Sequence, residues 1–126
     1  MRTKTVLRFY FRAENIERVY DNLILKNALN FEDFGLGRAE RVCEFIKEKD
    51  ELADLWSYVD GIISSFNEGD RTALKLYANL RTGLKCRGAE TVKAVKRAVI
   101  KFRRRALRLE SFEKALAIVG KYGCLL

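Results

Sequence analysis

The chain has 126 residues and a mass of 14.6 kDa, enough for a single domain, residues 1–126, with one modest core. Its residues are 48% hydrophobic and 33% charged, which is too apolar for a disordered chain and too often charged for a membrane span. The absence of histidine removes the commonest general base and metal ligand, and a net charge of +8 argues for an anionic partner.

Residues 3–12 form the main segment in which apolar and polar side chains alternate. Leu7, Phe9 and Phe11 are separated by arginine or tyrosine, and a period of two favours a β-strand. Because no partner strand is visible, we interpret the segment as the start of a helix or an extended arm, with a strand paired across a dimer as the third alternative. Arg8 and Arg12 also interrupt any apolar signal peptide, so we expect a cytoplasmic protein.

Beyond this segment, apolar residues recur every three or four positions, and the chain contains no proline. This pattern predicts an all-α fold, a compact bundle of about five helices with a short extended N-terminal arm or strand as an added feature. The expected helices cover residues 14–29, 38–66, 70–83, 89–109 and a last segment from residue 111.

The segment 38–66 carries a long apolar seam, which predicts one long helix or two shorter ones broken near Asp50. Packing within the chain is the favoured role of the seam, and a homodimer through the 42–66 helix is the alternative. Cys43 lies beside the seam and is interpreted as a small buried hydrophobe. The seam consists of Val42, Cys43, Phe45, Ile46, Leu52, Leu55, Trp56, Val59, Ile62, Ile63 and Phe66.

Two polar residues are expected to cap the helices that follow the seam. Asp70 ends the turn that begins at Asn67 and is a good N-cap for the helix 70–83. Ser111 is expected to cap the last helix, which would fold back onto the bundle.

The positive charge of the chain is concentrated in one segment. Residues 1–70 hold 10 basic and 14 acidic side chains, residues 71–105 hold 12 and 1, and residues 106–126 hold 3 and 2, so the net charges are −4, +11 and +1. A local field of this size attracts polyanions, either nucleic acid or an anionic membrane surface. We expect nucleic acid and no membrane association.

The helix expected at 89–109 is amphipathic, with one apolar stripe and a broad basic arc on the other side. Like charges on one helix face repel one another, and Glu90 alone lies nearby to offset them, so a bound anion would explain the arc. A row of such charges fits the regularly spaced phosphates of DNA. The candidate nucleic-acid-binding residues are Lys85, Arg87, Thr91, Lys93, Lys96, Arg97, Lys101, Arg104, Arg105 and Arg108.

The stretch Thr91-Val92-Lys93, continued by a basic helix to Arg105, resembles the recognition helix of helix-turn-helix proteins, in particular sigma factor region 4 and the small phage regulators similar to it. The resemblance lies within residues 70–108 and implies that Glu90, Thr91, Lys93, Lys96 and Arg97 meet DNA first, with later arginines on phosphates. The connection from Thr82 to Gly88 is longer than the tight turn of that family.

No enzyme signature accompanies these features. Gly83 and Gly88 have the spacing of a phosphate-binding loop, but alanine and glutamate follow them where lysine and a hydroxyl residue are required. The acidic residues between 40 and 54 have no histidine partners and are interpreted as a solvated face. Because the three cysteines lack paired spacing, neither a disulfide framework nor a zinc site is expected. The sequence predicts no catalytic residues, cofactor or metal.

The sequence therefore predicts a small, helix-turn-helix-like regulatory protein that binds nucleic acid, DNA in preference to RNA, through a basic helix. The alternative is an adaptor or inhibitor of protein interactions that docks on an acidic partner, with the 42–66 seam or the tail of residues 122–126 as its contact.

Overall fold

The computed structural model describes residues 3–29, 36–80 and 88–121. In these ranges the chain forms six α-helices, one short 3-10 helix and no strand, which confirms the all-α prediction. The predicted count of about five was one too low. The helices are α1 (Thr3–Phe11), α2 (Ala13–Leu29), α4 (Leu36–Ile63), α5 (Glu68–Asn79), α6 (Ala89–Arg105), the 3-10 helix η2 (Leu109–Ser111) and α7 (Glu113–Lys121).

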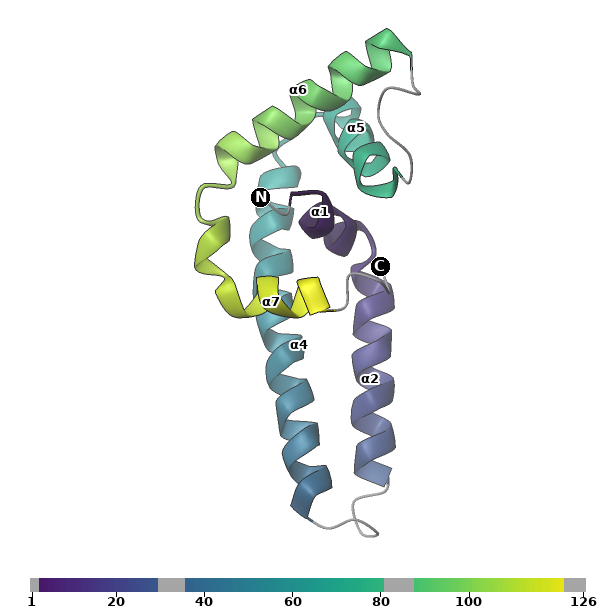
Figure 1. The fold of residues 1–126 in the computed structure, drawn as a ribbon, viewed down its shortest axis with the longest axis vertical. Coiled ribbons are helices and arrows are strands. Elements are labelled where there is room, and N and C mark those ends of the chain that lie inside the picture. The colour runs from purple at the N-terminus through teal and green to yellow at the C-terminus, as the bar shows by residue number, and fades with distance from the viewer. Residues whose placement is uncertain (1–2, 30–35, 81–87, 122–126) are drawn as a thin grey trace.

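The long helix α4 organises the fold (Figure 1). It runs antiparallel to α2, and these two helices form a hairpin that extends away from the other elements. Around the C-terminal half of α4 lie α1, α5, α6 and α7, with α6 crossing near the end of α4. The basic helix α6 therefore lies at one end of the molecule, and the C-terminal end of α2 and the N-terminal end of α4 lie at the other (Figure 1).

Helix α4 is continuous, so of the two alternatives at 38–66 the single long helix is the one observed. It runs from Leu36 to Ile63, about 42 Å at 1.5 Å per residue. Lys49, which interrupts the apolar seam, is accommodated because its Nζ lies 2.7 Å from Oδ1 of Asp21 on α2. That hydrogen bond raises the pKa of Lys49 and keeps a charged group at the boundary of the helix pair.

The additional helix is α1, so of the three alternatives for residues 3–12 the helix is the one observed, and the extended arm and the strand are not. Val6, Leu7 and Phe9 are all buried, although they do not share one face of a helix. The reason is that α1 is packed against α2, α4, α5 and α7 and is covered on several sides. A helix buried on several sides loses the regular 3.6-residue pattern, so alternation here was not a signal for a strand.

The core lies where α1, α5, α6 and α7 meet the C-terminal half of α4. Leu55, Val59 and Ile63 of the apolar seam are at most 1% exposed, so this part of the seam packs within the chain. Phe102 of α6 and Leu74 of α5 are fully buried in the same cluster. The basic helix is therefore fixed to the molecule by the core, as its apolar stripe predicted.

Three expectations about single residues were wrong. Asn67, not Asp70, caps α5: its side-chain oxygen accepts a hydrogen bond from the backbone N–H of Asp70 at 2.8 Å. Ser111 ends η2, and its hydroxyl donates to the carbonyl of Arg108, so α7 begins two residues later. Cys43 is exposed, not buried.

Candidate nucleic-acid interface

One side of helix α6 is buried against the core, so the opposite side faces solvent. Val95, Ala98, Val99 and Phe102 are buried against the core. These positions are spaced by three and four residues and therefore share one face of the helix. The helix ends at Arg105, earlier than the expected Leu109, because the backbone leaves helical geometry at Ala106, with φ −89° and ψ 45°.

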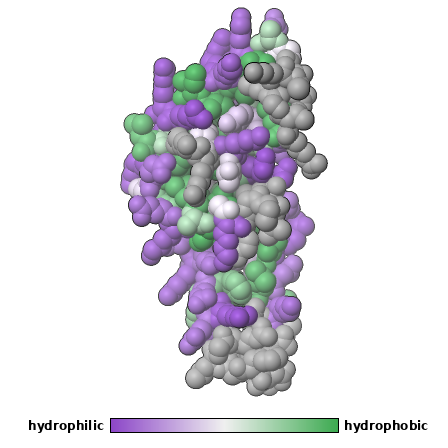
Figure 2. Space-filling model, in the orientation of Figure 1, coloured by the Kyte–Doolittle hydropathy of each residue, from purple (hydrophilic) through white to green (hydrophobic). Residues whose placement is uncertain are grey.

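The opposite side of α6 is cationic and exposed, and we call it the basic face. Hydrophilic side chains project from this end of the molecule, with hydrophobic surface between them (Figure 2). Residues from 93 to 104 cover about 16 Å of helix. They line a shallow depression whose members are Lys93, Lys96, Arg97, Ile100, Lys101 and Arg104.

Four cations of the basic face are exposed and unneutralised within the described ranges. There, no ion pair or side-chain hydrogen bond engages Lys93, Lys96, Arg97 or Arg104. Among the described residues, no ion pair joins an acidic residue of α4 to these cations. These four cations therefore lie together on one side of α6.

Lys101 has a different environment at the edge of the basic face. Its Nζ lies 2.8 Å from Oδ2 of Asp70 at the start of α5 and 5.0 Å from the ring centroid of Phe66. The ion pair directs this lysine toward α5 and neutralises its charge. Of the candidates within α6, Lys101 is thus the cation already paired with a carboxylate of this chain.

The arginines at the C-terminal end of α6 contact the body of the protein. Nε of Arg103 donates to Oγ1 of Thr3, 3.1 Å away, so this arginine reaches α1. Arg105 donates to Oγ of Ser65 at 2.6 Å and lies 4.7 Å from the ring centroid of Phe66. Both partners are uncharged, so these arginines keep their positive charge at the margins of the basic face.

The remaining candidates lie elsewhere. Thr91 is half-buried and precedes Val95 by one turn, which places it on the buried side of α6. Arg108 is exposed but lies beyond the helix, where its backbone N–H donates to the hydroxyl of Tyr58 at 3.0 Å. Lys85 and Arg87 lie outside the described residues.

Sequence reasoning did not single out Arg71 and Lys75 of α5 or Ile100 of α6. Arg71 and Lys75 are both exposed and lie one turn apart on a helix that packs beside α6. The two residues belong to the segment 71–105, whose excess of basic side chains was the one sequence feature that pointed to them. Ile100 lies among the cations of the basic face and is 49% exposed. The apolar stripe of the helix did not indicate this residue, because Ile100 falls outside the stripe.

The connection between α5 and α6 is longer than the corresponding connection in helix-turn-helix proteins. Nine residues, 80–88, separate α5 from α6, whereas the family joins its supporting and recognition helices by three or four. The connection between α4 and α5 has four residues, 64–67.

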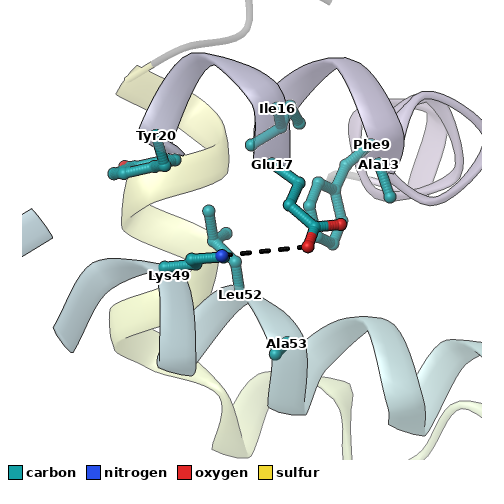
Figure 3. Close-up of a pocket in the computed structure, with 8 residues that line it drawn as sticks. All are labelled: Phe9, Ala13, Ile16, Glu17, Tyr20, Lys49, Leu52 and Ala53. Atoms are coloured by element: carbon teal, nitrogen blue, oxygen red, sulfur yellow. Dashed lines mark ion pairs between the residues drawn. The ribbon is translucent and has the colours of Figure 1, made fainter. Parts of the chain in front are cut away.

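A separate pocket lies between α2 and α4, with the ion pair of Lys49 and Glu17 at 3.8 Å across it (Figure 3). Its volume of about 130 Å³ is below the roughly 300–1,000 Å³ of typical small-molecule sites. Its other lining residues are Phe9, Ala13, Ile16, Tyr20, Leu52 and Ala53. We therefore treat it as an imperfection in hairpin packing.

Two further observations complete the description of the candidate site. Among the described residues, no group of three or more metal-ligating side chains gathers. The helices in those ranges also include none that is long and apolar enough to cross a membrane. Comparisons of the chain with protein-family models, with curated proteins and with solved structures find no match.

Proposed function

We propose that this protein binds nucleic acid, DNA in preference to RNA, through the basic face of α6, and that it acts as a small regulator. One observation carries the proposal: four exposed lysines and arginines follow one side of a helix without a neutralising carboxylate among the described residues. Nothing in the described part of the chain offsets the repulsion between these cations, and like charges on one helix face destabilise the helix.

A polyanion with regularly spaced charges removes this repulsion. Each phosphate that an ammonium or guanidinium group neutralises releases a condensed counterion, and this release is the main source of non-specific affinity for DNA. The helix is anchored by its buried side, so its basic face is presented as a rigid unit. A rigid cationic helix about 10–12 Å in diameter is a shape that the major groove accepts.

The proposal is tested by fluorescence anisotropy with a labelled 20-base-pair DNA duplex between 50 and 200 mM KCl. Four phosphate contacts predict that log affinity falls against log salt concentration with a slope of about −3.6. No binding at 50 mM KCl, or binding that is indifferent to salt, would overturn the proposal.

A pair of charge-matched variants locates the interface. Lys93→Gln, Arg97→Gln and Arg104→Gln together should lower the affinity at least tenfold and flatten the salt slope by about 3. The control combines Arg18→Gln, Arg41→Gln and Lys47→Gln, three exposed residues of the hairpin, and removes the same net charge. Equal losses in both triple variants would show that net charge alone, and not the basic face, determines binding.

The competing hypothesis of an adaptor that docks through the apolar seam has less support. Leu55, Val59 and Ile63 of the seam are buried in the core of this chain and are not available to a partner. Cys43 and Ile46 are its exposed members, and two such residues make a small contact. The tail of residues 122–126, the other contact considered for an adaptor, lies outside the described residues.

A further inference from the structure

An isoleucine occupies the middle of the basic face. Ile100 is 49% exposed, and it is separated by three or four residues from Lys96, Arg97 and Arg104. These spacings make the three cations its immediate neighbours on the helix surface. An exposed apolar side chain is ordinary by itself, but this one is surrounded by the groups that the proposed function assigns to phosphates.

The position of Ile100 determines what it would meet on a duplex. When a helix lies along the major groove, side chains at the centre of its outer face point at the base edges, and longer side chains at the flanks reach the two phosphate backbones. Lysine and arginine have the length to reach outward, whereas Ile100 is short and lies between them. The groove floor is therefore the surface opposite Ile100.

The floor of the major groove offers one apolar group, the C5-methyl of thymine, and its other groups are hydrogen-bond donors or acceptors. Ile100 has neither a donor nor an acceptor to satisfy them. We propose, resting on the proposed function, that Ile100 contacts thymine methyl groups, so that the preferred ligand of the basic face is B-form DNA containing A·T pairs at the centre of the site.

The same contact distinguishes DNA from RNA. Uracil lacks the methyl group, and the major groove of an A-form helix is too deep and narrow for this helix face. The preference for DNA, which charge alone does not explain, then has a physical cause in one side chain.

The test compares 20-base-pair duplexes of random core sequence, made either with thymine or with deoxyuridine in its place. Removing a methyl that is buried on binding should weaken wild-type binding about fourfold per contact. Ile100→Ala should bind both duplexes equally, while Ile100→Val, which retains a branched apolar surface, should keep part of the preference. Arg104→Gln should weaken binding to both duplexes by the same factor. Circular dichroism confirms that each variant remains helical.

The outcomes separate this inference from the proposed function. If the wild type binds neither duplex, the proposed function itself fails. If it binds both equally, or if Ile100→Ala still prefers thymine, the proposed function stands and the thymine contact is wrong. Binding to vesicles of anionic phospholipid with no binding to either duplex would assign the exposed isoleucine to a membrane surface and overturn both.

Discussion

The pair formed by Asp70 and Lys101 links the stability of the fold to the charge of the basic face. The side chains are 18% and 37% exposed, so the pair is partly screened by solvent. It contributes to the packing of α5 on α6, and it also removes one cation from the surface available to phosphates.

The substitution Asp70→Asn should therefore strengthen nucleic-acid binding and lower the free energy of unfolding. Release of Lys101 should steepen the salt slope by about 0.9, and loss of the pair should lower the free energy of unfolding by less than about 1 kcal/mol. Anisotropy titrations and urea denaturation measure the two effects. Asp54→Asn is the matched control, because it changes the charge equally at an exposed residue of α4. An identical gain in the control would contradict the role of Lys101.

Tyr10 of α1 contacts two residues of α4, Asp60 and Trp56. Its hydroxyl donates to Oδ1 of Asp60 at 2.6 Å, its ring stacks on Trp56, and Nε1 of Trp56 donates to its carbonyl at 3.3 Å. Burial, followed by the hydrogen bond to Asp60 and the charge of that carboxylate, raises the pKa of the Tyr10 hydroxyl well above 10.

The raised pKa predicts a pH-dependent contribution to stability. The folded state holds the Tyr10 proton more tightly than the unfolded state, so the contribution is complete below about pH 10 and is lost as the pH rises toward the folded pKa. At pH 7, Tyr10→Phe should cost about 1 kcal/mol for the lost hydrogen bond. Urea denaturation should show this difference between wild type and variant shrinking between pH 10 and 11. A difference that stays constant over that range would contradict the prediction.

At the scale of elements, the start of α5 depends on a local capping signal, and the capping residue is Asn67 rather than the predicted Asp70. The connection of residues 64–67 ends in Asn67, whose side chain accepts the N–H of Asp70. Asn67 and Asp70 are both good capping residues, so propensity alone does not separate them. The residue before the cap, Phe66, is 2% exposed in the core.

Asn67→Ala should lower the free energy of unfolding by about 1 kcal/mol, because one N–H at the start of α5 loses its partner. Asn67→Ser preserves an acceptor at the same place and should cost much less. Urea denaturation of both variants at pH 7 measures the difference. Equal stabilities of the alanine and serine variants would show that the cap contributes nothing.

The sequence predicted the buried and exposed faces of α6 well. For the residues of α1 it left a helix, an arm and a strand open. In α6 one side meets the core and the other meets solvent, so burial repeats with the helical period. In α1 several neighbours cover the helix, and even Arg8 is drawn inward to donate from Nε to the carbonyl of Ala78 at 3.0 Å. Local periodicity is informative only where one side of an element is exposed.

The whole molecule divides into a multi-helix core and a two-helix hairpin. The core surrounds the C-terminal half of α4, where Leu55 is fully buried. The hairpin leaves apolar side chains partly exposed, among them Leu25 at 57% and Ile46 at 44%. Most of the hydrophobic stabilisation therefore lies at the end of the molecule that also holds the basic helix.

Two leucine-to-alanine substitutions test where the hydrophobic stabilisation lies. Leu55→Ala should lower the free energy of unfolding by about 2–5 kcal/mol, because it opens a cavity in the core. Leu25→Ala, at a residue of the hairpin that is 57% exposed, should change it by less than about 0.5 kcal/mol. Thermal denaturation monitored by circular dichroism compares both with the wild type. Comparable losses at the two sites would contradict the location of the core.

The sequence by itself determined the all-α class and the basic side of α6, because each follows from the spacing of apolar residues or from charge counted along the chain. It left open whether residues 38–66 form one helix or two. Tertiary structure decided that residues 3–11 form a helix, that Lys101 is paired with Asp70 and that Thr91 faces inward. Each of these depends on a contact between residues far apart in the chain or on how α6 is rotated against the core. Such contacts leave no trace in local periodicity, whereas the free energy of burial that fixes them is a property of the assembled core.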